Sequence, residues 1–366
     1  MPHVIHVIST PSGIGGAELV VGALVAAGTK QGWEQTVLNP FAADPADLAL
    51  AEVCSGARYS AAPCASPRDL PAVARWLRAE LLSSEPDLVH SHLFHAGALV
   101  ATVRPRRLPT VLTHHHGDHL VTEGRRAAEI IDRIALRRYD RVVAISDWVA
   151  RFLQTRYRCP AERLVTIPNG WVNAATTGRS LRTGQESAVI LCIANFRAQK
   201  GHRELIRAFG EVRAEIPHAR LLLVGSGPLE AETRAMVDGA GLTGCVEFVG
   251  RTNDVAHYLA SADVFALASR YEPQGIAVIE AMASRLPVVA TAVGGIVETI
   301  AEGETGFLVR PGDVEGLARA LIRLLRSPEE RARVGTAARE WARGRSMDAT
   351  ADRYLGLYTD LLEGRR

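Results

Sequence analysis

Short apolar runs alternate with longer amphipathic segments along most of the chain. Runs such as 88–91, 110–113 and 141–145 are too short for buried helices, so they predict strands. The segments 125–138 and 147–157 carry apolar residues at helical spacing and predict helices. Strands and helices that alternate in this way are typical of parallel, doubly wound sheets. The sequence therefore predicts an α/β fold.

The alternation is interrupted once, at 173–187, where the chain is polar and rich in Gly and Thr. Such a composition predicts a linker between domains. We expect one domain over residues 1–172 and a second over residues 188–347. The final segment, 348–366, is amphipathic over most of its length and predicts a last helix. The further strands expected in the second domain are 188–194, 220–224, 246–249, 263–267 and 288–291.

Bulk composition fits a globular protein of 366 residues, with 47% hydrophobic and 22% charged residues. The net charge of +2 favours no particular partner and gives no sign of nucleic-acid binding. The five cysteines are scattered without a C-x-x-C pair, which predicts a reducing compartment. No run approaches the roughly 18 apolar residues that span a bilayer. We expect a cytoplasmic protein.

Positive charge is concentrated in residues 101–165, which hold 13 Arg and 7 acidic residues. One interpretation is an arginine-rich surface that is simply solvated. The other is attraction to an anionic lipid or an acidic acceptor, since a basic surface provides it. The second interpretation predicts a weak peripheral contact with the inner face of a membrane.

The segment 270–283 carries the clearest candidate chemistry. Glu272 follows a predicted strand, and Glu280 lies within the predicted helix 276–284. In open α/β sheets the loops after the strands line the ligand crevice. Backbone N–H groups at the start of a helix attract anions and hydroxyls. An acid on this loop is suited to bind sugar hydroxyls, and a second acid further in is suited to bind a ribose.

This segment is followed by 287–296, Glu298 and 306–309, in an order that resembles the C-terminal half of a retaining glycosyltransferase of the GT-B family 4. The resemblance covers nearly the whole chain. It implies two Rossmann-like, doubly wound domains that face each other across a cleft, with the last helix packed back on the first domain. It also implies a nucleotide-sugar donor on the second domain and a hydroxyl-bearing acceptor, either a glycan, a lipid-linked sugar or a small molecule, on the first.

The resemblance assigns roles to individual donor-side residues. Glu280 would bind the ribose hydroxyls, and Glu272 would contact the donor sugar. Backbone of the segment 246–251 would read the base. The full set of donor-binding residues that it implies is Gly15, Gly16, Gly225, Gly227, Val249, Gly250, Gln274, Gly275, Ile276 and Glu280.

The glycine turn after the first strand, Gly13-x-Gly15-Gly16, also fits a dinucleotide fingerprint in part. However, Glu18 stands where the third glycine of that fingerprint belongs, and no acid ends the second strand at 37–40. NAD is therefore not expected. The resemblance implies instead that this turn approaches the donor diphosphate.

Arg197 and Lys200 lie on a loop before a predicted helix, where two cations can neutralise a diphosphate without a metal. The family pattern places an Arg five residues before the Lys, but here that position is Asn195. Arg197, three residues before, is expected to take its place. The chain has no Asp-x-Asp pair to hold a divalent ion. We therefore expect no metal and no cofactor.

Histidines cluster strongly, with seven of the twelve between residues 90 and 119. Their spacing offers enough ligands for a metal site, but Asp118 is the one carboxylate that adds to them and no Cys lies nearby. The resemblance implies that either His115 or His116 faces the donor sugar, and two alignments leave that choice open. His90 and His92 would either orient the acceptor or simply pack.

The resemblance, together with the residues that carry it, implies a retaining hexosyltransferase that is independent of metal. The expected catalytic residues are His115, His116, Arg197, Lys200 and Glu272. A UDP-linked GlcNAc or glucose is the first expectation for the donor, and GDP-mannose the second. Two alternatives remain open: a non-hydrolysing sugar-nucleotide epimerase on the same fold, and a non-catalytic binder of nucleotide sugars.

Overall fold

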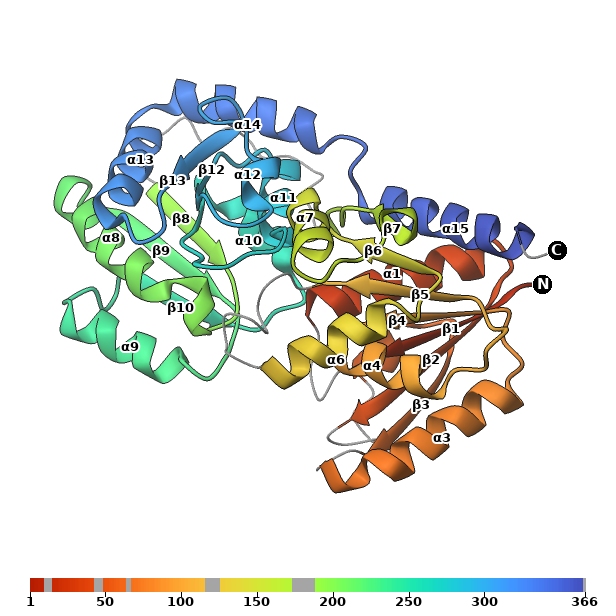
Figure 1. Cartoon of the computed structure of the whole chain (residues 1–366). Helices are drawn as coiled ribbons and strands as arrows, with labels where there is room; N and C mark the ends of the chain where they lie inside the picture. The colour runs from red at the N-terminus through yellow and green to blue at the C-terminus, as the bar shows by residue number, and fades with distance from the viewer. Residues whose placement is uncertain (10–14, 43–48, 64–66, 116–125, 173–187, 365–366) are drawn as a thin grey trace. The chain divides into compact units, whose positions relative to one another are not determined.

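The computed structural model divides the chain into two compact units (Figure 1). Unit 1 contains Met1–Asn169 and Met347–Arg366, and unit 2 contains Gly170–Ser346. The structure describes the whole chain except residues 10–14, 43–48, 64–66, 116–125, 173–187 and 365–366. The predicted linker 173–187 thus lies outside the described residues. No helix of the described part is both long and apolar enough to cross a membrane.

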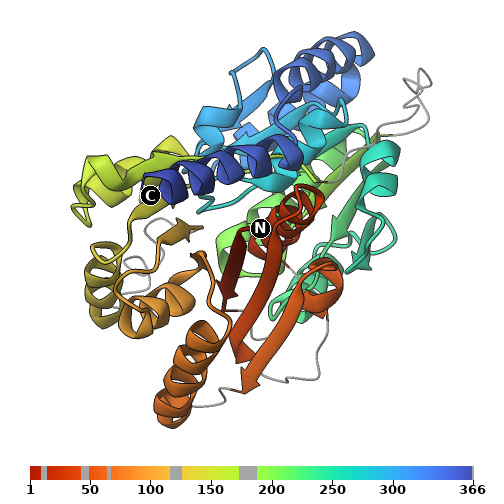
Figure 2. The same cartoon turned by 90° about the vertical axis from the view of Figure 1, so that its right-hand side faces the viewer.

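Unit 1 is built on a parallel sheet of seven strands in the order β3-β2-β1-β4-β5-β6-β7. Every residue of the central strands β1, β4 and β5 is buried, because helices cover both faces of such a sheet. Figure 2 shows β1, β2 and β3 side by side in red and orange. The strands are β1 (His3–Ile8), β2 (Glu34–Ala42), β3 (Arg58–Pro63), β4 (Leu88–His92), β5 (Thr110–His114), β6 (Arg141–Ala144) and β7 (Leu164–Thr166).

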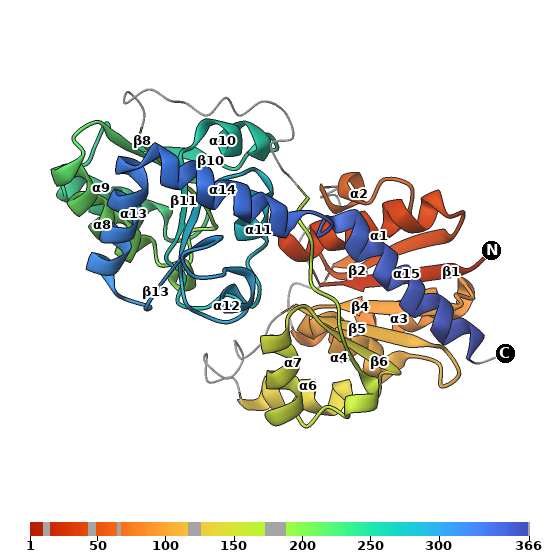
Figure 3. The same cartoon turned by 90° about the horizontal axis from the view of Figure 1, so that it is seen from above.

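The final helix, α15, belongs to unit 1 and packs beside α1, as Figure 3 shows. It buries Tyr354 and Tyr358 completely. The hydroxyl of Tyr358 contacts Nδ1 of His90 at 2.5 Å, and that of Tyr354 contacts the Thr113 hydroxyl at 3.0 Å. The helices of this unit are α1 (Gly16–Lys30), α2 (Ala49–Val53), α3 (Leu70–Ser83), α4 (Phe94–Val103), α6 (Arg126–Leu136), α7 (Asp147–Thr155) and α15 (Met347–Glu363).

Unit 2 repeats the design with six parallel strands in the order β10-β9-β8-β11-β12-β13. Its strands are β8 (Ala188–Ile193), β9 (Ala219–Val224), β10 (Val246–Gly250), β11 (Val264–Leu267), β12 (Val288–Thr291) and β13 (Gly306–Val309). Its helices are α8 (His202–Glu215), α9 (Glu230–Gly239), α10 (Val255–Ser261), α11 (Ile276–Ala283), α12 (Ile296–Thr299), α13 (Val314–Arg326) and α14 (Pro328–Ala342). One apolar core runs through this unit.

The two parallel sheets with interleaved helices confirm the predicted α/β fold. Unit 1 ends its first segment after Asn169, slightly earlier than the expected boundary at residue 172. The sequence pattern did not predict β3 and α4. β3 is a half-exposed edge strand without an apolar run, and α4 is apolar on most sides, so neither shows a clear period.

Candidate functional site

The loop between β11 and α11 is held in place by the backbone of a glycine pair. Gly295 donates its N–H to the carbonyl of Glu272 at 3.0 Å. Gly294 has φ +54°, and a Cβ on it would lie 2.0 Å from the same carbonyl oxygen. A side chain at position 294 would therefore push the Glu272 loop away.

Lys200 and Glu272 form an ion pair, with Nζ 2.5 Å from Oε2. Both side chains are largely buried, at 17% and 11% exposure. Lys200 ends a short 3-10 turn, Ala198–Lys200, and its N–H donates to the Arg197 carbonyl at 2.9 Å. The sequence predicted Lys200 as a cation for the diphosphate and Glu272 as an acid for the donor sugar. In the structure these two side chains form an ion pair with each other. The Arg197 side chain is exposed on the same turn.

Two helix N-termini open at the same edge of the sheet as this pair. α8 follows β8 and α11 follows β11, and these two strands are neighbours. Gly201 and Gly275 are the N-cap residues, and neither has a side chain to bond the first N–H groups. Both helix N-termini carry partial positive charge. Together with the side-chain charges of Lys200 and Arg197, they make this edge suited to bind an anion.

The glycine loops of unit 2 lie at the ends of the next two strands. Gly225 follows β9 and donates its N–H to the carbonyl of Gly250, the last residue of β10, at 2.9 Å. Phe196 donates its N–H to the Ser226 carbonyl at 3.1 Å, beside Gly227. The structure thus brings the predicted donor residues Gly225, Gly227, Val249 and Gly250 to the edge that carries Arg197.

Buried polar groups complete this region. Glu280 on α11 and Gln274 on the loop before it are both 5% exposed. Ser269, two residues after the end of β11, is fully buried, and its hydroxyl has no hydrogen-bond partner among the described residues. An orphaned buried hydroxyl next to the Glu272 loop is a further candidate for ligand contact. Nothing in the sequence pattern distinguishes Ser269 from other serines at strand ends.

In unit 1 the glycine turn after β1 is already capped. Gly15 is the N-cap of α1, and its N–H donates to Oε2 of Glu18 at 2.9 Å. The Glu18 side chain is 8% exposed. The residue that replaces the third glycine of the fingerprint therefore places a carboxylate at this helix N-terminus. An approach of diphosphate to Gly15 and Gly16 would have to displace or avoid that carboxylate.

His90 and His92, for which the sequence left open either an acceptor role or simple packing, lie in the interior of unit 1. Both rings are fully buried, and all four of their nitrogen atoms contact other side chains. Nδ1 of His92 lies 3.3 Å from Nε2 of His115, which follows the end of β5 and is 7% exposed. The structure thus places His92 behind His115 rather than at a surface.

The remaining histidines of the cluster are placed separately. His114 is paired with the buried Asp132 at 2.8 Å. His116, the alternative to His115, lies outside the described residues, and so does His119. The choice between His115 and His116 therefore stays a prediction.

The nitrogens of His6, His90 and His92 approach within 4.8 Å of one another, which is close enough to ask whether they hold a metal. The surroundings fit a metal poorly. The rings of His90 and His92 are tilted by 42° with centroids 3.9 Å apart. His90 already contacts Tyr358 and Thr113, and the group contains no carboxylate to offset a dication.

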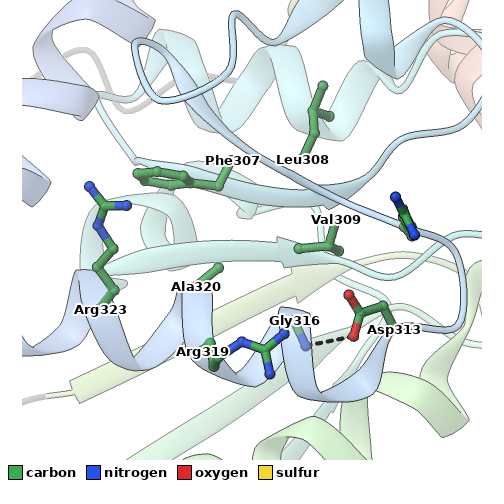
Figure 4. A pocket seen from close by; sticks show the side chains of 9 residues that line it. Phe307, Leu308, Val309, Asp313, Gly316, Arg319, Ala320 and Arg323 are labelled. Carbon is green, nitrogen blue, oxygen red and sulfur yellow. Dashed lines mark hydrogen bonds between the residues drawn. The ribbon is translucent and has the colours of Figure 1, made fainter.

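A surface hollow of about 400 Å³ lies elsewhere on unit 2 (Figure 4). It is lined by β13 and α13, including Phe307, Arg319 and Arg323. The Arg323 guanidinium covers the Phe307 ring at 4.8 Å and is also paired with Glu330. The hollow contains none of the predicted site residues, so it is not the candidate site.

Comparison with known proteins decides the family. Residues 14–171 match the family described as Glycosyltransferase Family 4, and residues 176–341 match the family described as Glycosyl transferases group 1. The D-inositol 3-phosphate glycosyltransferase of Nocardioides sp. is 31% identical over 305 residues, covering 74% of this chain and 67% of that protein. This chain belongs to glycosyltransferase family 4.

Other similar proteins agree with the assignment. The N-acetyl-alpha-D-glucosaminyl L-malate synthase of Bacillus anthracis is 29% identical over 292 residues, covering 75% of each chain. The sucrose-phosphate synthase from Thermosynechococcus elongatus superposes with a TM-score of 0.85 at 26% identity, covering 99% of this chain and 100% of that one. The predicted GT-B fold and the predicted glycosyltransferase family are thereby confirmed. The roles of the individual site residues stay predictions.

The buried histidines of this glycosyltransferase predict a loss of stability in acid. Burial lowers the pKa of His6 to about 4 and that of His115 to about 3. The unfolded chain binds protons from about pH 6.5 downward, whereas the folded chain resists them until well below that. The free energy of unfolding should therefore fall as the pH drops from about 6.5 to about 4, by up to ~1.4 kcal/mol per pH unit for each such histidine.

Urea unfolding of the wild type, His6→Gln and His257→Gln at several pH values checks this expectation. His257 is exposed and serves as the control. The slope against pH should be smaller in His6→Gln and unchanged in His257→Gln. Equal slopes in all three proteins would contradict the prediction.

Proposed function

We propose that this glycosyltransferase moves a hexosyl group from a nucleoside-diphosphate sugar to an acceptor hydroxyl, with retention of the anomeric configuration and without a metal. The donor binds to unit 2 at the edge formed by β8, β9, β10 and β11. The ion pair between Lys200 and Glu272, set between two helix N-termini, carries the proposal. GlcNAc or glucose on UDP is the first candidate donor and mannose on GDP the second.

The charges of this edge support a metal-independent departure of the diphosphate. As the glycosidic bond breaks, negative charge grows on the phosphate oxygens, and cations stabilise this charge best when they are already in position. Lys200 is positioned by Glu272, and the two uncapped helices add their partial charges. Arg197 is exposed on the same turn and free of the burial that fixes Lys200, so it is suited to close on the phosphates when they arrive.

Glu272 has a second role in the proposal. When a donor phosphate pairs with Lys200, the Glu272 carboxylate loses its ion-pair partner and can accept hydrogen bonds from the donor sugar. Glu280, buried one helix turn further in, is suited to hold the ribose hydroxyls. His115 or His116 of unit 1 would contact the sugar being transferred. Retention follows if the acceptor attacks from the face that the diphosphate leaves. A double displacement would need a well-placed carboxylate nucleophile, whereas Glu272 and Glu280 are assigned here to the donor sugar and the ribose.

The proposed function is tested by ligand-induced stabilisation followed by product analysis. A panel of UDP-, GDP- and dTDP-sugars is screened with and without EDTA, and a donor at a hundred times its Kd should add about 2.7 kcal/mol of stability. NMR of the reaction with acceptor should show a new glycosidic linkage with the anomeric configuration of the donor. An epimerised donor would favour the epimerase, an unchanged donor the non-catalytic binder, and loss of binding in EDTA would overturn metal independence.

Replacing Lys200 separates binding from catalysis. Lys200→Ala should lower kcat about a hundredfold or more and also weaken donor binding, because the phosphate charge increases in the transition state. Arg220→Ala is the matched control, since Arg220 is an exposed cation paired with Glu247 on the surface of the same unit. Steady-state kinetics and donor titration measure both effects. A change in KM alone would remove Lys200 from the leaving-group role.

We further propose that α6 of unit 1 rests on an anionic lipid bilayer, where a lipid-linked acceptor would be found. Ile130, Ile131 and Ile134 expose 59%, 49% and 59% of their surface on one face of this helix. Its two acids are already engaged, Glu129 by Arg156 and Asp132 by His114. The net charge that this helix presents therefore comes from its arginines, which complements an anionic surface.

The bilayer proposal predicts binding to vesicles of mixed phosphatidylcholine and phosphatidylglycerol, and weak or no binding to phosphatidylcholine alone. The double variant Ile130→Ser with Ile134→Ser should lose most of the binding. Leu82→Ser is the control, since Leu82 is 52% exposed on a different helix, α3. Cosedimentation that is equal in all three proteins would refute the role of α6.

A further inference from the structure

Four side chains of unit 1 form a continuous chain of contacts in the interior. Oε1 of Gln35 lies 3.1 Å from Nε2 of His6. Nδ1 of His6 lies 3.4 Å from Nε2 of His92, and Nδ1 of His92 lies 3.3 Å from Nε2 of His115. The chain crosses from β2 through β1 and β4 to the end of β5, and all four residues are buried. Each ring uses one nitrogen toward each neighbour.

The chain has a direction, because a neutral imidazole carries one proton and has one acceptor nitrogen. An amide oxygen only accepts, so Nε2 of His6 must be the donor toward Gln35. Nδ1 of His6 then accepts from Nε2–H of His92. Nδ1 of His92 in turn accepts from Nε2–H of His115. With Gln35 in this orientation, His115 is left with a lone pair on Nδ1.

The histidine rings of the chain are neutral. Neutral rings are required if every ring is to donate at one nitrogen and accept at the other. Burial lowers the pKa of His6 and His115, and that of His90 and His92 falls well below its usual range for the same reason. A proton added to Nδ1 of His6 or to Nδ1 of His92 would place two N–H groups against each other. Neutral rings with a single direction satisfy every contact.

The Gln35 amide packs against helix α1. Gly28 of α1 has no side chain, and a Cβ there would lie 2.4 Å from Nε2 of Gln35. That Nε2 has no hydrogen-bond partner among the described residues. The amide is thus seated against a glycine with its oxygen turned toward His6.

We propose that Gln35, His6 and His92 are positioning residues that hold His115 as the Nε2–H tautomer, so that its Nδ1 accepts a hydrogen bond from a sugar hydroxyl. This inference rests on the proposed function for the role of His115, but the tautomer itself does not. The three residues touch no ligand, and they act through the hydrogen bonds of the chain. Reversing the chain would turn Nδ1 of His115 into a donor and repel the hydroxyl hydrogen.

The test uses protein labelled with ¹⁵N in histidine rings, together with steady-state kinetics. In the unliganded wild type, His6, His92 and His115 should all carry the proton on Nε2. Gln35→Met removes the acceptor that sets the direction, so a signal for Nδ1–H of His115 should appear. In the same variant kcat should fall about tenfold, the effect of losing one hydrogen bond in the transition state, with little change in donor KM.

His3→Gln is the matched control. His3 lies on the same strand as His6 and contacts Thr36 and the Ser84 carbonyl, outside the chain. It should leave both the His115 tautomer and kcat unchanged. Gly28→Ala is a second variant that crowds the Gln35 amide without removing it, and it should shift the tautomer in the direction of Gln35→Met.

The outcomes separate this inference from the proposed function. A His115 tautomer that is unaffected by Gln35→Met and Gly28→Ala overturns the inference, whatever the enzyme transfers. A tautomer that responds while kcat does not means that the chain sets the tautomer but His115 takes no part in the reaction, which overturns the role proposed for it. Protonated, charged histidine rings at neutral pH in the wild type would also overturn the inference.

Discussion

Parallel strands deliver their carboxyl ends to one edge of a sheet, and almost everything that this glycosyltransferase uses depends on that constraint. In unit 2 the turn before α8, the two glycine loops and the Glu272 loop follow four strands that are adjacent in the sheet. Their sequence separation is large, yet the sheet brings their backbones together without any need for direct contacts among them. In unit 1 the same rule places His92 and His115 at the ends of neighbouring strands.

The polar groups at these edges are preorganised by one another before any ligand is present. Lys200 is held by Glu272, Gly15 by Glu18, and His115 by a row of buried side chains. Such internal partners offset the cost of keeping charged and polar groups in a poorly hydrated place. A ligand then exchanges partners rather than ordering loose side chains, which reduces the entropy lost on binding.

The sequence predicted the fold well because the apolar runs are short and the central strands are fully buried, a pattern that few folds without a covered parallel sheet would produce. It also located the loops that carry Glu272, Lys200 and the glycines, since each follows such a run. It did not predict which side chains would meet. Lys200 and Glu272 are 72 residues apart, and neither carries a local signal for the other.

The histidines show the same limit. In a strand that is buried on both faces, alternation does not tell a ligand-facing residue from an interior one, so His90 and His92 were indistinguishable from a site histidine until the structure was known. The β2 residue Gln35 and the α1 residue Gly28 gave no reason for attention at all. The two residues matter because α1 and β2 bring them into contact, and such a contact cannot be predicted from a local sequence pattern.

Unit 1 is assembled from two pieces of chain, with all of unit 2 between them. During synthesis the first 169 residues emerge, and then the whole of unit 2, before α15 can supply Tyr354 and Tyr358 to the core beside His90 and Thr113. Unit 2 is thus continuous in the chain and complete before α15 emerges, whereas unit 1 still lacks the helix that contacts His90 and Thr113. A chain that stops within unit 2 would therefore leave His90 and Thr113 without their tyrosine partners.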